Sequence, residues 1–365
     1  MRCDQPPTTT KKPQPRRSHS SSQRRKSGIP RVPTADQWKS WKRMQFCIVN
    51  DPRNGGKITF FVGEDILVLN HNWRPDQRYD MCDSWVGKIL DIRGNSPRNT
   101  WVVVQWYFSG KDIEECKQAK GGTAGVDTSI YGKFERSLSQ DRQVISSLSI
   151  NGKATVVEFD ETSSVQEPIP AECFYTRRAY NSLFGSVRPT VHESITCICG
   201  RPYKPDEPDP MHFCPRLGCK RWYHESCLQG SGYISDKSSD ELIRQPLDIP
   251  QSRISRVPPD LFRLACTPVI RGGSTYGVSG NVKAVCEARE WTQLYSSTPW
   301  PENCPRLLMN GITLDRWLDG LDGVEVEELI YPDDENGSES FFAEKRFQRA
   351  EASPPFECPS CGKPV

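Results

Sequence analysis

The chain has 365 residues, which is room for two or three domains. Hydrophobic residues make up 35% of it, a share that indicates ordered domains joined to polar segments rather than one large globule. No signal-peptide pattern and no apolar run of about 18 residues occurs, so neither a secreted nor a membrane-spanning protein is expected. With a reducing compartment thus expected, the fifteen cysteines favour metal binding over a disulfide framework.

The net charge of +2 is unevenly distributed, because residues 1–33 hold nine Lys or Arg and one acidic residue, Asp4. This segment is rich in Pro, Ser and Thr and too polar to bury a core, so residues 1–43 are predicted to form a disordered basic tail. Its "RRKS" at 24–27 is typical of a nuclear-import signal or of a non-specific contact with DNA phosphates. A solvated linker with no partner explains the same composition.

Short β-branched and aromatic runs, separated by turn residues, begin near residue 44. They predict a mostly antiparallel β domain over residues 44–188. The runs are "ITFFVGEDILVLN" at 58–70, "DSWVGKILDI" at 83–92, "NTWVVVQWYF" at 99–108 and "GKATVVEFD" at 152–160. This region has no glycine-rich phosphate loop and no nucleophile elbow, and we expect no enzyme activity from it.

These runs, with "WYFSGKD" at 106–112 and "IPAECFY" at 169–175, resemble a bromo-adjacent homology (BAH) domain, a chromatin-binding module without catalytic activity. In BAH domains that bind methylated lysine 27 of histone H3, an aromatic cage surrounds the methylammonium group. The resemblance places this cage at Trp85, Trp106 and Phe108. Strand alternation puts residues 106 and 108 on one face, and a quaternary ammonium gains about 0.5–2 kcal/mol from each good ring contact.

That cage has two departures from the family pattern. Trp and Phe stand where the family has tyrosines, and Ser139-Gln140-Asp141 stands where lysine-27 binders often have Ser-x-His. The alternative interpretation is that the three aromatic residues are ordinary core positions.

Further along, eight possible metal ligands occur in four pairs. The pairs are Cys197 with Cys199, Cys214 with Cys219, His224 with Cys227, and Cys358 with Cys361. The order of the first six, with Trp222 two residues before the histidine, resembles a PHD finger. That resemblance implies a cross-brace, in which the first and third pairs bind one zinc ion and the second and fourth pairs bind another. Both ions would be structural, because protein side chains fill every coordination position.

The last pair follows the third after about 130 residues. Closing so long a loop costs only about 2 kcal/mol more than closing an ordinary one, whereas zinc binding in small fingers supplies about 10–16 kcal/mol. A RING-type ubiquitin ligase also uses two zinc ions in this topology and is the alternative interpretation of the eight ligands.

The PHD resemblance also implies a second methyl-lysine pocket. Its lining would be Tyr203, Met211 and Trp222, and its ligand the N-terminus of histone H3 methylated on lysine 4. The histone tail would add a strand beside residues 210–214, since backbone hydrogen bonds give affinity in such complexes. The remaining histidine of the region, His212, is expected at the surface.

The ligand spacing divides the finger into a first part, residues 194–229, and a last part, residues 355–365. Residues 230–354 are then an insertion, predicted to be a small helical subdomain that projects from the finger. Its predicted helices span residues 258–266, 280–295 and 313–321, the last with Thr313 as N-cap. Its Arg271-Gly272-Gly273 sequence predicts a turn.

A BAH domain closely followed by such a finger resembles the BAH-PHD proteins of plants and fungi. The resemblance implies a nuclear chromatin reader that binds the histone H3 tail and the nucleosome, in transcriptional repression and gene silencing within a repressive chromatin complex. Zinc is the implied cofactor, and no membrane partner is implied. Besides the ubiquitin ligase, the alternative is a chromatin scaffold that binds DNA through the basic tail.

Overall fold

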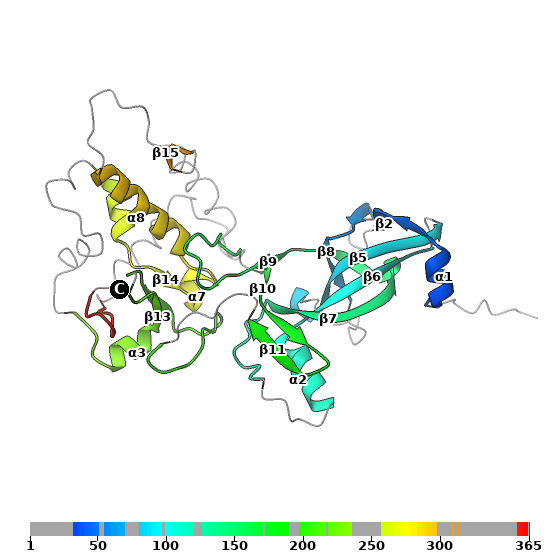
Figure 1. The fold of residues 1–365 in the computed structure, drawn as a ribbon, viewed down its shortest axis with the longest axis horizontal. Helices are drawn as coiled ribbons and strands as arrows, with labels where there is room; N and C mark the ends of the chain where they lie inside the picture. The colour runs from blue at the N-terminus through cyan, green and yellow to red at the C-terminus, as the bar shows by residue number, and fades with distance from the viewer. Residues whose placement is uncertain are drawn as a thin grey trace, which may run out of the picture.

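The computed structural model describes residues 32–50, 55–69, 80–96, 99–119, 126–170, 172–189, 197–216, 218–235, 257–297, 308–309, 312–313, 356–363 and 365. A large sheet lies at one end of the molecule, and the longest helix lies at the other, together with a small sheet and the C-terminus (Figure 1). We call residues 32–189 the sheet lobe and residues 197–365 the finger lobe.

The sheet lobe is built on a nine-stranded sheet in the order β11-β10-β7-β6-β5-β4-β8, with β1 beside β5 and β9 beside β10. Its strands are β1 (Lys42–Met44), β4 (Asp65–Val68), β5 (Trp85–Ser96), β6 (Asn99–Phe108), β7 (Glu135–Ser146), β8 (Ile150–Ala154), β9 (Val156–Glu158), β10 (Phe174–Asn181) and β11 (Ser186–Pro189). The central pairs are antiparallel, and β10 runs parallel to β7 and β9. The predicted mostly β character of this region is therefore confirmed.

The hairpin of β2 (Phe46–Asn50) and β3 (Lys57–Phe61) covers one face of this sheet. Cys47, Val49 and Phe60 point inward and pack with residues such as Ile89 and Val104. Alternate residues of the hairpin face outward, as period-2 alternation requires. Short helices complete the lobe: η1 (Met81–Asp83), α2 (Gly110–Ala119) and η2 (Ser147–Ser149).

Residues 32–43 are ordered, although they fall within the predicted basic tail of residues 1–43. Helix α1 (Ala35–Ser40) begins with a capping box, in which Thr34 and Gln37 exchange side-chain and backbone hydrogen bonds. The Arg93 guanidinium lies 5.2 Å from the Trp38 ring centroid, so the helix is held against β5. The tail prediction was too long because the Thr-x-x-Gln capping signal was missed; residues 1–31 lie outside the described residues.

The finger lobe contains a three-stranded sheet in the order β13-β12-β14. Strands β12 (Met211–Cys214) and β13 (Arg221–His224) form a hairpin, and helix α3 (Glu225–Gly230) follows directly. The third strand, β14 (Ile270–Arg271), comes from the insertion and pairs antiparallel with β12. The edge of the finger is thus covered by a segment nearly 60 residues further along the chain.

The described helices of the insertion pack into the molecule, whereas a projecting subdomain was predicted. Helices α6 (Pro259–Cys266) and α8 (Val282–Ser297) form close to two predicted ranges, with α7 (Gly273–Tyr276) between them. Leu261, Val285 and Trp291 are fully buried in one cluster with finger residues and with Tyr175 of the sheet lobe. The described helices of the insertion are therefore part of the core that joins the two lobes, because they carry an apolar face that must be buried.

Two further strands of the insertion are described, β15 (Leu308–Met309) and β16 (Ile312–Thr313), which form a small hairpin. Thr313, predicted as a helix N-cap, lies in β16. The rest of the predicted helix 313–321 lies outside the described residues. None of the helices that the structure describes is long and apolar enough to cross a membrane.

Candidate metal clusters and aromatic sites

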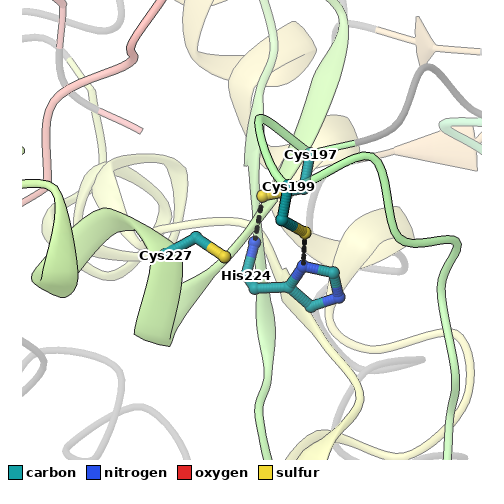
Figure 2. Close-up of side chains that lie close together, drawn as sticks. All are labelled: Cys197, Cys199, His224 and Cys227. Atoms are coloured by element: carbon teal, nitrogen blue, oxygen red, sulfur yellow. Dashed lines mark hydrogen bonds between the residues drawn. The ribbon is translucent and has the colours of Figure 1, made fainter.

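The first group of possible metal ligands combines a loop, a strand end and a helix. Cys197 and Cys199 lie on a tight turn, His224 ends β13, and Cys227 lies in α3 (Figure 2). Their four ligand atoms all lie within 4.8 Å of one another. The Cys199 Sγ is 3.4 Å from His224 Nδ1, and the His224 backbone N–H donates to Cys197 Sγ.

The second group joins the finger to the end of the chain. It consists of Cys214, Cys219, Cys358 and Cys361, again with all ligand atoms within 4.8 Å. The Sγ atoms of Cys214 and Cys361 are 3.8 Å apart, and those of Cys358 and Cys219 are 3.9 Å apart. The structure thus places the eight residues in the two sets of four that the sequence predicts, first with third pair and second with fourth.

The insertion begins and ends at adjacent points, which explains how so long a segment is accommodated. Ile234 bridges to Phe356, and the Glu357 N–H donates to the Tyr233 carbonyl. The Ser235 hydroxyl also donates to the Glu357 carboxylate at 3.0 Å. Residues 233–235 and 356–358 therefore run side by side. The chain thus returns to the finger next to the point where the insertion starts, and this return brings the last ligand pair to the finger.

The spacing of the ligand atoms fits a tetrahedral zinc ion. Zinc–sulfur bonds of about 2.3 Å at tetrahedral angles separate two sulfurs by about 3.8 Å, which is the separation seen in the second group. Burial lowers the pKa of His224, which favours the neutral imidazole that a metal needs. Both groups are therefore able to hold a metal ion and are compatible with zinc.

In the second group, hydrogen bonds favour the thiolate of Cys358, whereas burial raises the pKa of Cys214 and of Cys219. Burial raises the pKa of Cys358, but hydrogen bonds from the Tyr223 hydroxyl and the Ser360 and Cys361 N–H groups outweigh it and lower the pKa to about 7. Such donors beside the ligands orient them and stabilise their negative charge. The bound ion would hold the segments together and, with four protein ligands, would leave no position for a reacting water.

Two of the three predicted cage residues of the sheet lobe lie together. The rings of Trp85 and Trp106 are both partly exposed, with centroids 5.9 Å apart at an interplanar angle of 70°. Trp106 faces Gly87 of β5 in the register, where a Cβ would lie 3.2 Å from the Trp106 ring. The Trp106 indole N–H donates to Gln143. The pair forms an aromatic corner, and the nearest atom to a Cβ at position 87 would be Val104 Cγ1 at 2.1 Å.

Phe108 is placed differently. Its ring lies 5.1 Å from that of Tyr180 and packs in a cluster with Ile113 of α2 and Tyr131, whereas Trp85 and Trp106 pack on the cluster under the β2–β3 hairpin. The structure thus brings two of the predicted residues together and sets Phe108 in a different hydrophobic cluster.

The predicted pocket of the finger lobe is buried. Tyr203, Met211 and Trp222 are 3%, 1% and 3% exposed. The Arg271 guanidinium carbon lies 4.0 Å from the Tyr203 ring centroid and 3.9 Å from that of Trp222. A cationic side chain of the insertion therefore fills the place that a methylated lysine was predicted to take.

His212 is buried as well, contrary to the expected surface position. Its Nε2 lies 3.0 Å from a Glu225 carboxylate oxygen, and its ring packs against Phe356 at 4.9 Å. The strand β14 on one side and the C-terminal segment on the other enclose it, and neither neighbour is adjacent in sequence.

A buried ionic network that the sequence did not predict connects the two lobes. The Glu135 carboxylate, fully buried, accepts two hydrogen bonds from Arg177 and one from Arg178. Arg177 also pairs with Glu161, which in turn pairs with Arg271 of the finger lobe at 3.2 Å. Paired charges of this kind resist separation, since removing one partner leaves the other buried and uncompensated.

Comparisons with known proteins add little to this geometry. No family model matches the sequence, and no curated relative was found. Among solved structures, the chain is similar to the BAH domain of yeast Rsc2, at 18% identity and a TM-score of 0.27, with 40% of this chain and 54% of that chain covered. The chain thus spans about half the length of the solved chain it matches.

Proposed function

We propose that this protein is a chromatin reader whose sheet lobe binds a methylated lysine of a histone tail, with lysine 27 of histone H3 as the leading site. The Trp85–Trp106 corner carries the proposal, because its two rings are partly exposed and nearly perpendicular. A quaternary ammonium that contacts the faces of the two rings gains about 0.5–2 kcal/mol from each good contact.

The other parts of the proposal rest on the sequence. A reader of this kind acts in the nucleus without catalysis, with the nucleosome as partner and transcriptional repression as outcome. The lysine-4 role predicted for the finger lobe is not proposed, since Arg271 fills its aromatic site. DNA binding by the basic tail remains a prediction, and a steep salt dependence of duplex binding that disappears on removing residues 1–33 tests it.

The test is calorimetry of the zinc-loaded full chain with histone H3 peptides that carry trimethylated or unmethylated lysine 27. We expect binding of the methylated peptide only, and its loss in Trp106→Ala. Trp38→Ala is the matched control, because Trp38 is a partly exposed tryptophan of the same lobe that stacks on Arg93, and it should bind normally.

Equal affinity for the two peptides would reject the aromatic corner as a methyl-lysine site. Preference for another methylated lysine would keep the corner and reject only the specificity. Ubiquitin transfer by the purified chain with a conjugating enzyme would favour the ligase alternative.

A further inference from the structure

Strand β14 occupies the edge of β12 that a bound peptide would need. Met211 pairs with Arg271 and His212 with Ile270 in an antiparallel register. The Phe213 N–H continues the ladder by donating to the Val269 carbonyl at 2.9 Å. An unpaired strand edge is a template for another strand, and here the insertion supplies that strand.

The Arg271 side chain occupies the aromatic site beside this edge. Its guanidinium carbon lies within 4.0 Å of both the Tyr203 and the Trp222 ring centroids, and the residue is 1% exposed. Burial lowers its pKa and Glu161 raises it, and a guanidinium keeps its proton in proteins. The site therefore holds a stacked cation, the chemistry that aromatic cages select.

The backbone on both sides of Arg271 is shaped to hold the strand in place. Gly272 has φ +76°, and a Cβ there would lie 3.0 Å from the Tyr203 ring. Gly280, with φ +69°, passes so close to Ile270 that a Cβ would lie 2.0 Å from its carbonyl oxygen. Asn281 bonds both the N–H and the carbonyl of Ile270. A side chain at either glycine would be strained and would crowd these neighbours, so the strand is closely seated.

The sheet lobe completes the site. The Glu161 carboxylate accepts from Arg271 Nη2 at 3.2 Å, and its backbone carbonyl accepts from Nη1. Arg177 donates to the Tyr203 carbonyl at 3.1 Å. The guanidinium of the insertion thus meets aromatic faces from the finger and a carboxylate from the sheet lobe.

We propose that the finger lobe is a peptide-binding site occupied in cis. Strand β14 takes the place of a bound peptide strand, and Arg271 takes the place of its cationic side chain. The ligand class of this site is a β-strand bearing a cation that stacks on aromatic rings, and its resident ligand is the chain's own insertion. A histone tail does not enter while β14 is in place, so reading falls to the sheet lobe alone.

The test uses the zinc-loaded full chain and two probes: a histone H3 N-terminal peptide trimethylated on lysine 4, and tetramethylammonium chloride against sodium chloride at equal ionic strength. In the native chain, NMR signals of Tyr203, Met211 and Trp222 should not shift with either probe. In Arg271→Ala, the vacated site should bind tetramethylammonium, with saturable shifts of the Trp222 indole and a rise in Tm. Arg271→Lys is the matched control that keeps a cation, and it should not respond.

Binding of the lysine-4 peptide at Trp222 of the native chain, with a Kd below about 100 µM, would overturn the proposal. So would a folded Arg271→Ala variant with no saturable response. If that variant fails to fold, hydrogen exchange in the native chain is the deciding measurement. If β14 stays paired with β12, the exchange rate of the Phe213 amide should lie within about tenfold of the rates of the slowest α8 amides. Exchange of the Phe213 amide at the rate of an exposed amide would reject the proposal. Neither result depends on Trp106, so failure here and failure of the sheet-lobe proposal are distinguishable.

Discussion

The two lobes each contain a pair of aromatic rings, and the pairs differ in what covers them. In the sheet lobe, Trp85 and Trp106 form a partly exposed corner. In the finger lobe, Tyr203 and Trp222 are buried around Arg271. The ring chemistry is similar, so the capacity to bind an outside cation depends on whether another segment of the chain already supplies one.

The lobes also differ in what they leave exposed. In the finger, β12 is flanked by β13 and β14 and has no open edge among the described residues. The hairpin of β2 and β3 in the sheet lobe instead carries outward-facing Phe46, Ile48 and Phe61, each about half exposed. The finger lobe is thus organised around contacts within the chain, and four predictions test this difference, from the largest effect to the smallest.

Removing a metal ligand should affect the finger lobe most strongly. We expect Cys358→Ser to bind fewer than two zinc ions and to lose the fold of the finger lobe, as Cys214→Ser should, because zinc supplies about 10 kcal/mol or more to such folds. Native mass spectrometry gives the metal count, and near-UV circular dichroism gives the packing. Cys286→Ser, which changes a cysteine outside both groups, is the control. A Cys358 variant that retains two ions contradicts the assignment.

Truncating one tryptophan in each lobe should give different losses of stability, because one tryptophan is buried and the other is partly exposed. Trp222→Ala should destabilise the finger lobe by about 3–5 kcal/mol, as expected for a buried aromatic residue. Trp106→Ala, at a partly exposed position, should cost about 1–2 kcal/mol of stability and lose peptide binding. Urea unfolding of the zinc-loaded chain measures both. Similar losses in the two variants would mean that the aromatic pairs do not differ as described.

Neutralising Glu161 should loosen the connection between the lobes. Its carboxylate pairs with both Arg177 and Arg271 and is mostly buried. We expect Glu161→Gln to cost about 1–3 kcal/mol, because charge-assisted hydrogen bonds to two buried guanidinium groups are weakened. Chemical denaturation monitored at both lobes is the measurement. An unchanged midpoint would show that the network does not couple them.

The smallest effect is expected at an exposed ion pair between the same two regions. Glu167 pairs with Lys283 of α8 at 2.6 Å, and its side chain is 70% exposed. Glu167→Gln should cost at most about 1 kcal/mol, and the difference should vanish in high salt. The same denaturation experiment at two salt concentrations serves as the matched control for Glu161→Gln. If Glu167→Gln lost as much stability as Glu161→Gln, the expectation that buried ion pairs contribute more than exposed ones would be wrong.

Local chemistry explains what was predictable from the sequence. Residue type and spacing mark the eight ligands as four pairs, and the resemblance to a PHD finger implies which pairs share an ion. The alternating runs of the sheet lobe and the apolar faces of α6 and α8 are periodic signals that need no knowledge of distant segments. Even the neighbourhood of Trp85 and Trp106 was accessible, because the resemblance to a BAH domain places both residues in one aromatic cage.

The sequence by itself therefore determined the ligand sets, the β domain and two helices of the insertion. Only the tertiary structure decided that His212 is buried, that Phe108 packs on Tyr180, and that Arg271 fills the aromatic site of the finger. Arg271 follows Tyr203 by nearly 70 residues. The periodicity of a sequence does not predict which distant strand will pair with a given strand edge. Such a contact is set by the packing of α6 and α8 into a shared core, which depends on the whole fold.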